Sequence, residues 1–169
     1  FIDTVMLLPI IALYAESLGA NVGLTGVIVG LYSITNTPAN VLFGRVVDKV
    51  GSKIPLIAGL LGSAVSLFLY SLCRIPLQLG LVRVAHGVSG GVIGPATMSS
   101  LSQCSAEGKR GRVMGIYGMA IAAAHKIGYP ASGHLANQWG YSAVFIVASG
   151  LLLLGALAAL MLPGDRIYP

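Results

Sequence analysis

The sequence predicts an all-α membrane protein with six transmembrane helices, and its composition and the distribution of its apolar residues support this fold class. The mean hydropathy is +0.86, and only 9% of the 169 residues are charged, whereas about a quarter are charged in a typical soluble domain. The apolar residues fall into separate runs, most of which reach the ~20 residues that cross a ~30 Å hydrocarbon core. The six predicted spans are residues 1–18, 22–43, 54–73, 76–101, 113–135 and 142–162.

The first predicted span, residues 1–18, is the shortest and carries the acidic residue Asp3. At about 1.5 Å per residue it covers only about 27 Å, so we expect that part of the span and a preceding tail are missing from the sequence. No basic segment or A-x-A cleavage site follows Phe1, which argues against a signal peptide. A carboxylate in a low-dielectric environment can exchange a proton near neutral pH, which would suit proton coupling. Hydration of Asp3 at the membrane boundary is the alternative.

The second predicted span, residues 22–43, carries a stripe of small and weakly polar side chains. They recur at steps of three and four, which places them on one helical face; they are Gly26, Gly30, Ser33, Thr37 and Asn40. Because such a face is unlike a lipid-facing surface, it predicts contact with another helix or with a cavity. Asn36 lies beside the stripe and is a candidate substrate ligand.

The loop from Gly44 to Lys53 joins the second span to the third. Its two glycines, Gly44 and Gly51, give the backbone the freedom that a tight turn between helices requires. Basic residues favour the cytoplasmic side of a membrane, and this short loop contains Arg45, Lys49 and Lys53. A cytoplasmic turn between two helices is therefore predicted here.

The fourth span, residues 76–101, contains an arginine and a glycine-rich face. Arg83, Gly87, Gly90 and Gly94 recur at steps of four, three and four, so they share one face, and its glycines would let another helix approach closely. A charge within a span usually faces a cavity or a partner. Snorkelling of Arg83 to the outer boundary, ~10 Å away, is the alternative.

Two further residues of this span matter for the predicted site. His86 is a candidate substrate ligand, and Gly91 joins the glycines expected to pack against another helix. By rise per residue, Asp3 and Arg83 differ by ~12 Å in depth, which predicts that they do not contact each other directly.

The fifth span, residues 113–135, brings a second pair of candidate ligands, His125 and Lys126. His125 ends a face of small residues that includes Gly111, Gly115, Gly118 and Ala122. A lysine inside a membrane loses its proton, pairs with a carboxylate or lines water, so Lys126 could recognise an anionic substrate; outward snorkelling is the alternative. Pro130 should bend this helix, and we expect Gly128, Pro130 and Gly133 to shape its packing.

Basic residues set the expected orientation. Only Arg74 lies on one side of the predicted membrane, and seven basic residues lie on the other: Arg45, Lys49, Lys53, Lys109, Arg110, Arg112 and Arg166. The positive-inside rule then predicts an integral protein of the plasma (inner) membrane with both termini in the cytoplasm. Cys73 and Cys104 would lie on opposite sides of the membrane, which excludes a disulfide between them.

The chain also contains a weak internal repeat. Gly44, Asp48 and Gly51 recur as Gly133, Asn137 and Gly140 at an offset of 89 residues. Three spans separate the two copies, so they face opposite sides of the membrane, as in inverted three-helix repeats. We therefore expect residues 1–73 and 76–162 to be two inverted repeats within one six-helix bundle that comprises residues 1–169.

The segment from Gly44 to Lys53 resembles the loop motif of the major facilitator superfamily of secondary transporters, G-x-L-A-D-[RK]-x-G-[RK]-[RK]. Ser52 departs from the motif, which has a basic residue there. Residues 83–91 resemble the R-x-x-x-G-x-x-G-G signature that the family carries in its fourth helix. The resemblance covers essentially the whole chain, but only the amino-terminal six-helix half of a twelve-helix family, and it implies that the carboxy-terminal half is absent.

Within that family, the first predicted span resembles the drug:proton antiporters through Asp3-Thr4-Val5, Pro9 and residues 14–19. The fifth span departs from their G-P-x-x-G-G element, since Pro130 stands one position late and Ser132 replaces a glycine. This departure leaves antiport open.

The resemblance implies proton-coupled export of a small organic molecule by alternating access. In this hypothesis Asp3 carries the proton, while Arg83 adjusts its proton affinity or holds an anionic group. Asn36, His86, His125 and Lys126 are the substrate candidates. The loop of Gly44, Asp48, Lys49, Gly51 and Lys53 would act as a conformational latch, with Asp48 pairing with the other half. Besides substrate, proton and bilayer, the expected partner is the missing half or a second copy.

Two other functions remain open. The protein could instead take up an anionic metabolite, which Lys126 and the altered fifth span favour. It could also be a non-transporting half that packs against a partner membrane protein through its glycine faces. No phosphate-binding loop, metal-ligand spacing or nucleophile–base arrangement is present, so we expect no enzyme, cofactor or metal, and the scattered net charge of +5 does not suggest nucleic acid.

Overall fold

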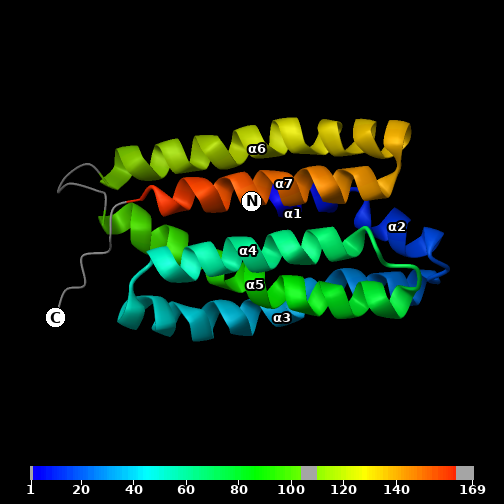
Figure 1. Cartoon of the computed structure of the whole chain (residues 1–169), viewed down its shortest axis with the longest axis horizontal. Coiled ribbons are helices and arrows are strands. Elements are labelled where there is room, and N and C mark those ends of the chain that lie inside the picture. The colour runs from blue at the N-terminus through cyan, green and yellow to red at the C-terminus, as the bar shows by residue number, and fades with distance from the viewer. Residues whose placement is uncertain (1, 104–109, 163–169) are drawn as a thin grey trace.

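The computed structural model describes residues 2–103 and 110–162, and these residues form an elongated bundle of helices (Figure 1). Every regular element in this part of the chain is α-helical, which confirms the predicted all-α class. The helices are α1 (Ile2–Leu7), α2 (Ile11–Ser17), α3 (Val22–Val50), α4 (Lys53–Tyr70), α5 (Pro76–Gln103), α6 (Arg110–Trp139) and α7 (Tyr141–Leu160).

Each predicted span coincides with a helix except the first, which is broken into α1 and α2. The break falls at Pro9, which lacks a backbone N–H and whose ring would clash with the carbonyl of residue 5 in a continuous helix. The first predicted span, residues 1–18, thus consists of two short helices that are separated at Pro9.

Local signals explain several helix ends. Asn21 caps α3, because its side-chain oxygen accepts a hydrogen bond from the Leu24 backbone N–H at 2.9 Å. Gly51 follows α3 with φ 88° and ψ 174°, and Gly140 precedes α7 with φ 79° and ψ 172°. These two glycines are equivalent positions of the 89-residue repeat, and both use a conformation that favours glycine.

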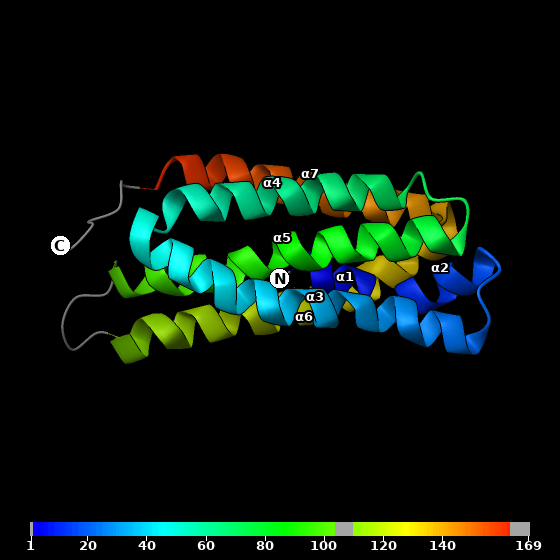
Figure 2. The same cartoon turned by 90° about the horizontal axis from the view of Figure 1, so that it is seen from below.

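Helix α5 lies between α3 and α4, which pack along it and hardly touch each other (Figure 2). Helix α7 packs on the opposite side of α4 from α5, and α1 lies against α6 and α7. A large apolar core, which includes Tyr14, Leu67, Tyr70 and Phe145, gathers α2, α4 and α7 at one end of the bundle. A smaller cluster around Val47 and Ala96 holds the other end.

Within the described ranges, α4 and α7 have the length and hydropathy of membrane-crossing helices. The stripes of glycine and polar residues lower the hydropathy of α3, α5 and α6. Many large apolar side chains cover the outside of the bundle, as a lipid environment requires. Phe1, Cys104, Lys109 and Arg166, on which parts of the orientation and disulfide expectations depend, lie outside the described residues.

Candidate functional site

A small polar pocket lies about halfway along the bundle, where α1, α3 and α5 meet. Its volume is about 120 Å³, and it is lined by Asp3, Thr4, Tyr32, Asn36, Asn40, Gly90, Ile93 and Gly94. The predicted glycine face of α5 borders this pocket through Gly90 and Gly94, but of the polar stripe predicted on α3 only Asn40 does. Gly26, Ser33 and Thr37 are exposed, so the expected contact of this stripe with a helix or cavity is not met within the described residues. The face of α3 that meets α5 carries Tyr32, Asn36 and Ala39 instead. The pocket can hold several water molecules, but it is smaller than the ~300–1,000 Å³ typical of ligand pockets.

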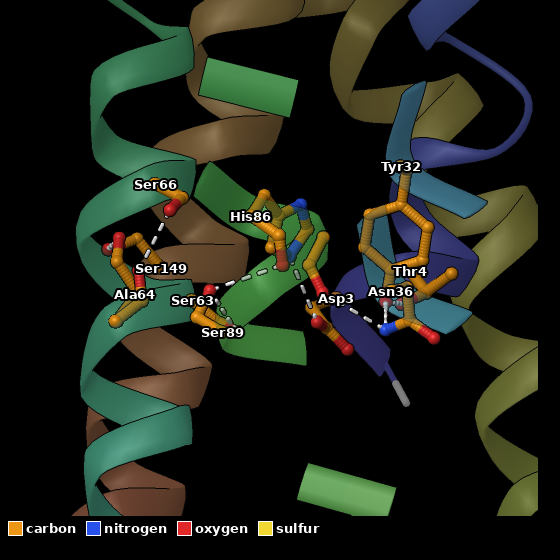
Figure 3. Close-up of polar contacts among 12 residues, drawn as sticks. Asp3, Thr4, Tyr32, Asn36, Ser63, Ala64, Ser66, His86, Ser89 and Ser149 are labelled. Carbon is orange, nitrogen blue, oxygen red and sulfur yellow. Dashed lines mark hydrogen bonds and ion pairs between the residues drawn. The ribbon is translucent and has the colours of Figure 1, made fainter. Parts of the chain in front are cut away.

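Asp3 lies at the wall of the pocket and is only 2% exposed. Its Oδ2 lies 3.4 Å from Nε2 of His86, which is completely buried on α5 (Figure 3). A buried carboxylate needs a positive charge or hydrogen-bond donors to offset its lost hydration. His86 supplies such a contact, although the sequence had suggested it only as a substrate ligand.

The second nitrogen of His86, Nδ1, lies 3.2 Å from the hydroxyl of Tyr70 on α4. A neutral imidazole has one donor and one acceptor nitrogen, and a carboxylate only accepts. Nε2–H of a neutral His86 therefore donates to Asp3, and Nδ1 accepts from Tyr70. The edge of the imidazole also meets the ring of Tyr32, with the two centroids 5.1 Å apart. The result is a buried polar chain that joins α1, α5 and α4.

Arg83 is also almost completely buried, but it has different neighbours. Its Nη2 donates to the backbone oxygen of Val29 at 3.4 Å, and its guanidinium carbon lies 5.1 Å from the centroid of the Tyr32 ring, in cation–π range. Among the described residues, Arg83 forms no ion pair with Asp3, as the depth argument predicted. That argument did not foresee His86, one turn further along α5.

Asn36 joins α3 to α5 beside the pocket. Its Nδ2 donates to the backbone oxygen of Gly87 at 3.3 Å and to the Tyr32 hydroxyl at 3.4 Å. The glycines of α5 make this close approach possible, since a Cβ on Gly91 would lie 2.6 Å from the Ala39 Cβ. Asn36 is thus an interface residue that also lines the pocket.

His125 and Lys126 lie apart from this group, on α6. Nδ1 of His125 lies 2.8 Å from its own helix's Ile121 oxygen, and its ring meets Tyr129 edge-on at 5.4 Å. Lys126 is exposed rather than buried, because α6 packs mainly against α1 and α7 and leaves much of its surface uncovered. Neither residue lines the pocket of Asp3.

The glycines and proline expected to pack on α6 have different surroundings. A Cβ on Gly128 would lie 2.8 Å from a Val5 methyl, so α6 closely approaches α1 there. Gly133 has no neighbouring atoms within 4 Å of such a Cβ. Pro130 lies inside α6 and is exposed.

The segment predicted as the latch loop lies at the end of the bundle remote from α2, but most of it is helical. Helix α3 continues to Val50, so Gly44 lies inside a helix and the turn expected there is wrong; only Gly51 and Ser52 separate α3 from α4. Asp48 and Lys49 are exposed, and Lys53 Nζ donates to the backbone oxygen of Leu162 after α7. Ser52, where the family motif has a basic residue, is only 1% exposed and accepts a hydrogen bond from Ser100 at 2.8 Å. A basic side chain would bring a charge into this buried position, which explains the departure from the motif.

Two aromatic residues of the site were not anticipated. Tyr32 lies four residues before Asn36 and so shares its helical face, a spacing that could have identified it. Tyr70 has no comparable signal, because only the packing of α4 on α5 brings its hydroxyl to His86.

Comparison with known proteins gives a family match over almost the whole chain. A family model described as the Major Facilitator Superfamily matches residues 1–168. The "Staphyloferrin B transporter" of Staphylococcus aureus (strain NCTC 8325 / PS 47) is 31% identical over 147 residues, which cover 83% of this chain and 35% of that protein.

Two other relatives are similar over a comparable region. The "Multidrug resistance protein MdtG" of Klebsiella pneumoniae (strain 342) is 29% identical over 154 residues, 88% of this chain and 37% of that protein. The "Uncharacterized MFS-type transporter YceJ" of Bacillus subtilis (strain 168) is 27% identical over 164 residues, 97% of this chain and 42% of that protein. The chain thus spans well under half the length of these relatives.

Proposed function

The chain belongs to the major facilitator superfamily, and from this premise we propose that it is one wall of a transporter that moves a small organic molecule across a membrane. The predicted family resemblance is thereby confirmed, and so is the expectation of a transport family rather than an enzyme. In the proposal, α1 with α2, α3, α4, α5, α6 and α7 provide six spans, and the site lies at the membrane midplane between two six-helix halves.

The observation that carries this proposal is the buried Asp3 at the wall of a polar pocket halfway along the bundle. An ionisable group at membrane depth marks a substrate or ion pathway. The other wall is a second half, and alternating access is the rocking of the two halves around the pocket. The uncovered surface of α6 is available for the contact between halves.

We propose proton-coupled export as the direction and energy source. One relative is named a multidrug resistance protein and another a staphyloferrin B transporter, names that fit a small organic cargo. Asp3 binds either a proton or, when ionised, a cationic substrate, so the two compete. Asp3 releases the proton on one side of the membrane and the substrate on the other. The inward flow of protons is thereby coupled to the outward flow of substrate.

The test uses the full-length protein in proteoliposomes with an imposed pH gradient and ethidium, a lipophilic cation, as the probe. We expect Asp3→Asn to reduce gradient-driven ethidium accumulation to that of empty liposomes, because the amide cannot bind a proton. The matched control is Glu16→Gln, which neutralises an exposed acid on α2 and should leave transport unchanged. Wild-type accumulation by Asp3→Asn would refute proton coupling at this residue.

Uptake of an anionic metabolite is the second candidate function, and the exposed lysine on α6 favours it. Succinate serves as the probe in the same liposomes. If the protein transports anions, Lys126→Gln should abolish succinate uptake and Asp3→Asn should retain it. Cation export gives the reverse pattern. The pair of variants therefore separates the two functions in one experiment.

A further inference from the structure

His86 is placed where it can sense the charge of Asp3 without touching a substrate. It is completely buried and does not line the pocket, whereas Asp3 lines it and lies between the pocket and the imidazole. Its two nitrogens reach groups on two other helices, the Asp3 carboxylate at 3.4 Å and the Tyr70 hydroxyl at 3.2 Å. An imidazole so enclosed is unsuited to bind cargo and suited to bind a proton.

Simple hydrogen-bond chemistry gives this chain two states. When His86 is neutral, Nδ1 accepts the proton of the Tyr70 hydroxyl. When His86 is charged, both of its nitrogens donate, so the Tyr70 oxygen must accept instead. Proton uptake by the imidazole thus reverses the His86–Tyr70 hydrogen bond, while the heavy atoms can stay in place.

We infer that Asp3 and His86 bind the coupling proton as a single unit, and that Tyr70 transmits its presence to the far end of the bundle. This inference rests on the proton coupling proposed above. The proton comes from water in the pocket that Asp3 lines and returns to it. Asp3 takes up the proton from the pocket, as proposed above, and passes it to His86, which is then an imidazolium paired with the Asp3 carboxylate. Return of the proton through Asp3 to the pocket leaves His86 neutral and Asp3 ionised.

Tyr70 is well placed for this role because it belongs to the aromatic cluster of the large core. Its ring lies 5.4 Å from that of Phe145 on α7. Its backbone oxygen accepts a hydrogen bond from the Tyr14 hydroxyl at 2.9 Å, and the same hydroxyl reaches the Cys73 oxygen at 2.9 Å. Tyr70 thus links the His86 hydrogen bond, through its ring and backbone, to the core that joins α2, α4 and α7.

The other charged or titratable groups near the pair are few in the part of the chain that the structure describes. Tyr32 on α3 meets His86 edge-on. Arg83 on α5 lies over the Tyr32 ring and its guanidinium also interacts with the Tyr70 hydroxyl. From α6, which packs against α1, His125 and Lys126 form no hydrogen bond or ion pair with Asp3 or His86. From α7, Phe145 packs next to Tyr70 and carries no charge.

The experiment is a pH titration of the full-length protein, labelled with ¹⁵N-histidine in lipid bilayers, followed by solid-state NMR. The signal of His86 is identified by its absence from His86→Gln, and its chemical shift distinguishes the two neutral tautomers from the imidazolium. We expect Asp3→Asn to move the titration midpoint of His86 by about one pH unit or more, as for strongly interacting sites. The signal of His125 is the internal control and should not move.

A second variant keeps the test decisive if Asp3→Asn does not fold. Tyr70→Phe retains the ring packing against Phe145 but removes the hydroxyl from Nδ1, so the proportions of the two neutral His86 tautomers should change. A His86 signal that stays neutral across about pH 5–8, or one that titrates identically with and without the Asp3 carboxylate, would overturn the inference.

These results are distinguishable from failure of proton-coupled transport itself. If ethidium accumulation depends on Asp3 but the titration of His86 does not, the proposal of proton-coupled export is supported and the inference of a proton shared by Asp3 and His86 is refuted. If the pair titrates as one unit but a pH gradient drives no transport, the proton site stands and the proposed coupling is wrong.

Discussion

Asp3 and Arg83 are both buried ionisable side chains, yet their surroundings suit opposite tasks. Arg83 rests on a ring face and a backbone oxygen, contacts that hold a permanent charge in place. Asp3 faces an imidazole that can itself gain or lose a proton. A group that changes its charge during a transport cycle needs a partner whose own protonation can change with it. Of these two residues, Asp3 has such a partner in His86.

The glycines of α5 also matter individually, because one added methyl group at such a position would prevent α3 from packing closely against α5. At Gly91 an added Cβ would lie 2.6 Å from the Ala39 Cβ and 2.9 Å from the Asn36 backbone oxygen. Neither neighbour is the end of a flexible side chain, so α3 itself would have to move.

We therefore predict that Gly91→Ala destabilises the bundle by about 1–3 kcal/mol, the usual cost of overpacking. Gly155→Ala on α7 is the matched control, since a Cβ there meets no atom within 4 Å, and it should be neutral or slightly stabilising because alanine favours helix. Thermal unfolding in detergent measures both. A melting temperature of Gly91→Ala equal to that of the wild type would contradict the steric argument.

At the scale of helices, α5 is the element on which α3 and α4 are assembled, and the contacts differ along its length. Near the middle, glycines bring α3 close and leave the polar pocket. At the end remote from α2, Ser100 of α5 donates to the buried Ser52 at the start of α4. Neighbouring Lys53 ties the same end of α4 to Leu162, just after α7. Hydrogen bonds thus help to hold this end together.

Restoring the basic residue of the family motif at this end should weaken the packing. We predict that Ser52→Lys lowers the free energy of unfolding by about 2 kcal/mol or more, because it loses a hydrogen bond and buries a charge. Ser102→Lys, at an exposed serine near the end of α5, is the control and should change little. Equal unfolding free energies for the two variants would show that the position tolerates the charge.

For the molecule as a whole, the proposed function requires that the polar pocket and the exposed end of α3 face a second half. Asp48 is exposed at the end of α3 and is free to meet a helix end there. A carboxylate at a helix N-terminus contributes up to about 1 kcal/mol. Such a contact would favour the conformation in which the two halves close on the latch side.

We predict that Asp48→Asn shifts the balance of the two open conformations by up to about fivefold, the equivalent of 1 kcal/mol. The readout is the labelling of Asn40→Cys, which lines the pocket, by an impermeant maleimide in a background that lacks Cys104. Asp48→Glu keeps the charge and should label like the parent. A labelling rate unaffected by Asp48→Asn would exclude a latch role.

Several features of the fold and site could be predicted because they depend on local spacing. Glycines at steps of three and four identified the face of α5 that packs against α3, whereas the stripe predicted on α3 is mostly exposed and its true contact face carries Tyr32, Asn36 and Ala39. The glycines in the segment after the second predicted span correctly predicted a turn at Gly51. Hydropathy placed most helices within a few residues, and it failed at α1 and α2, where Pro9 interrupts an otherwise apolar run.

The amino-acid pattern alone thus predicted an all-helical membrane-type protein and the glycine face of α5, and it singled out Asp3 as a candidate. The identity of Asp3's partner came only from the tertiary structure. Which residue of α5 lies opposite Asp3 depends on how far α1 is displaced along the bundle, and this displacement is set by its packing against α6 and α7 and by the break at Pro9. No periodicity within a single helix encodes that offset, so His86 and Tyr70 became visible only when the helices were assembled.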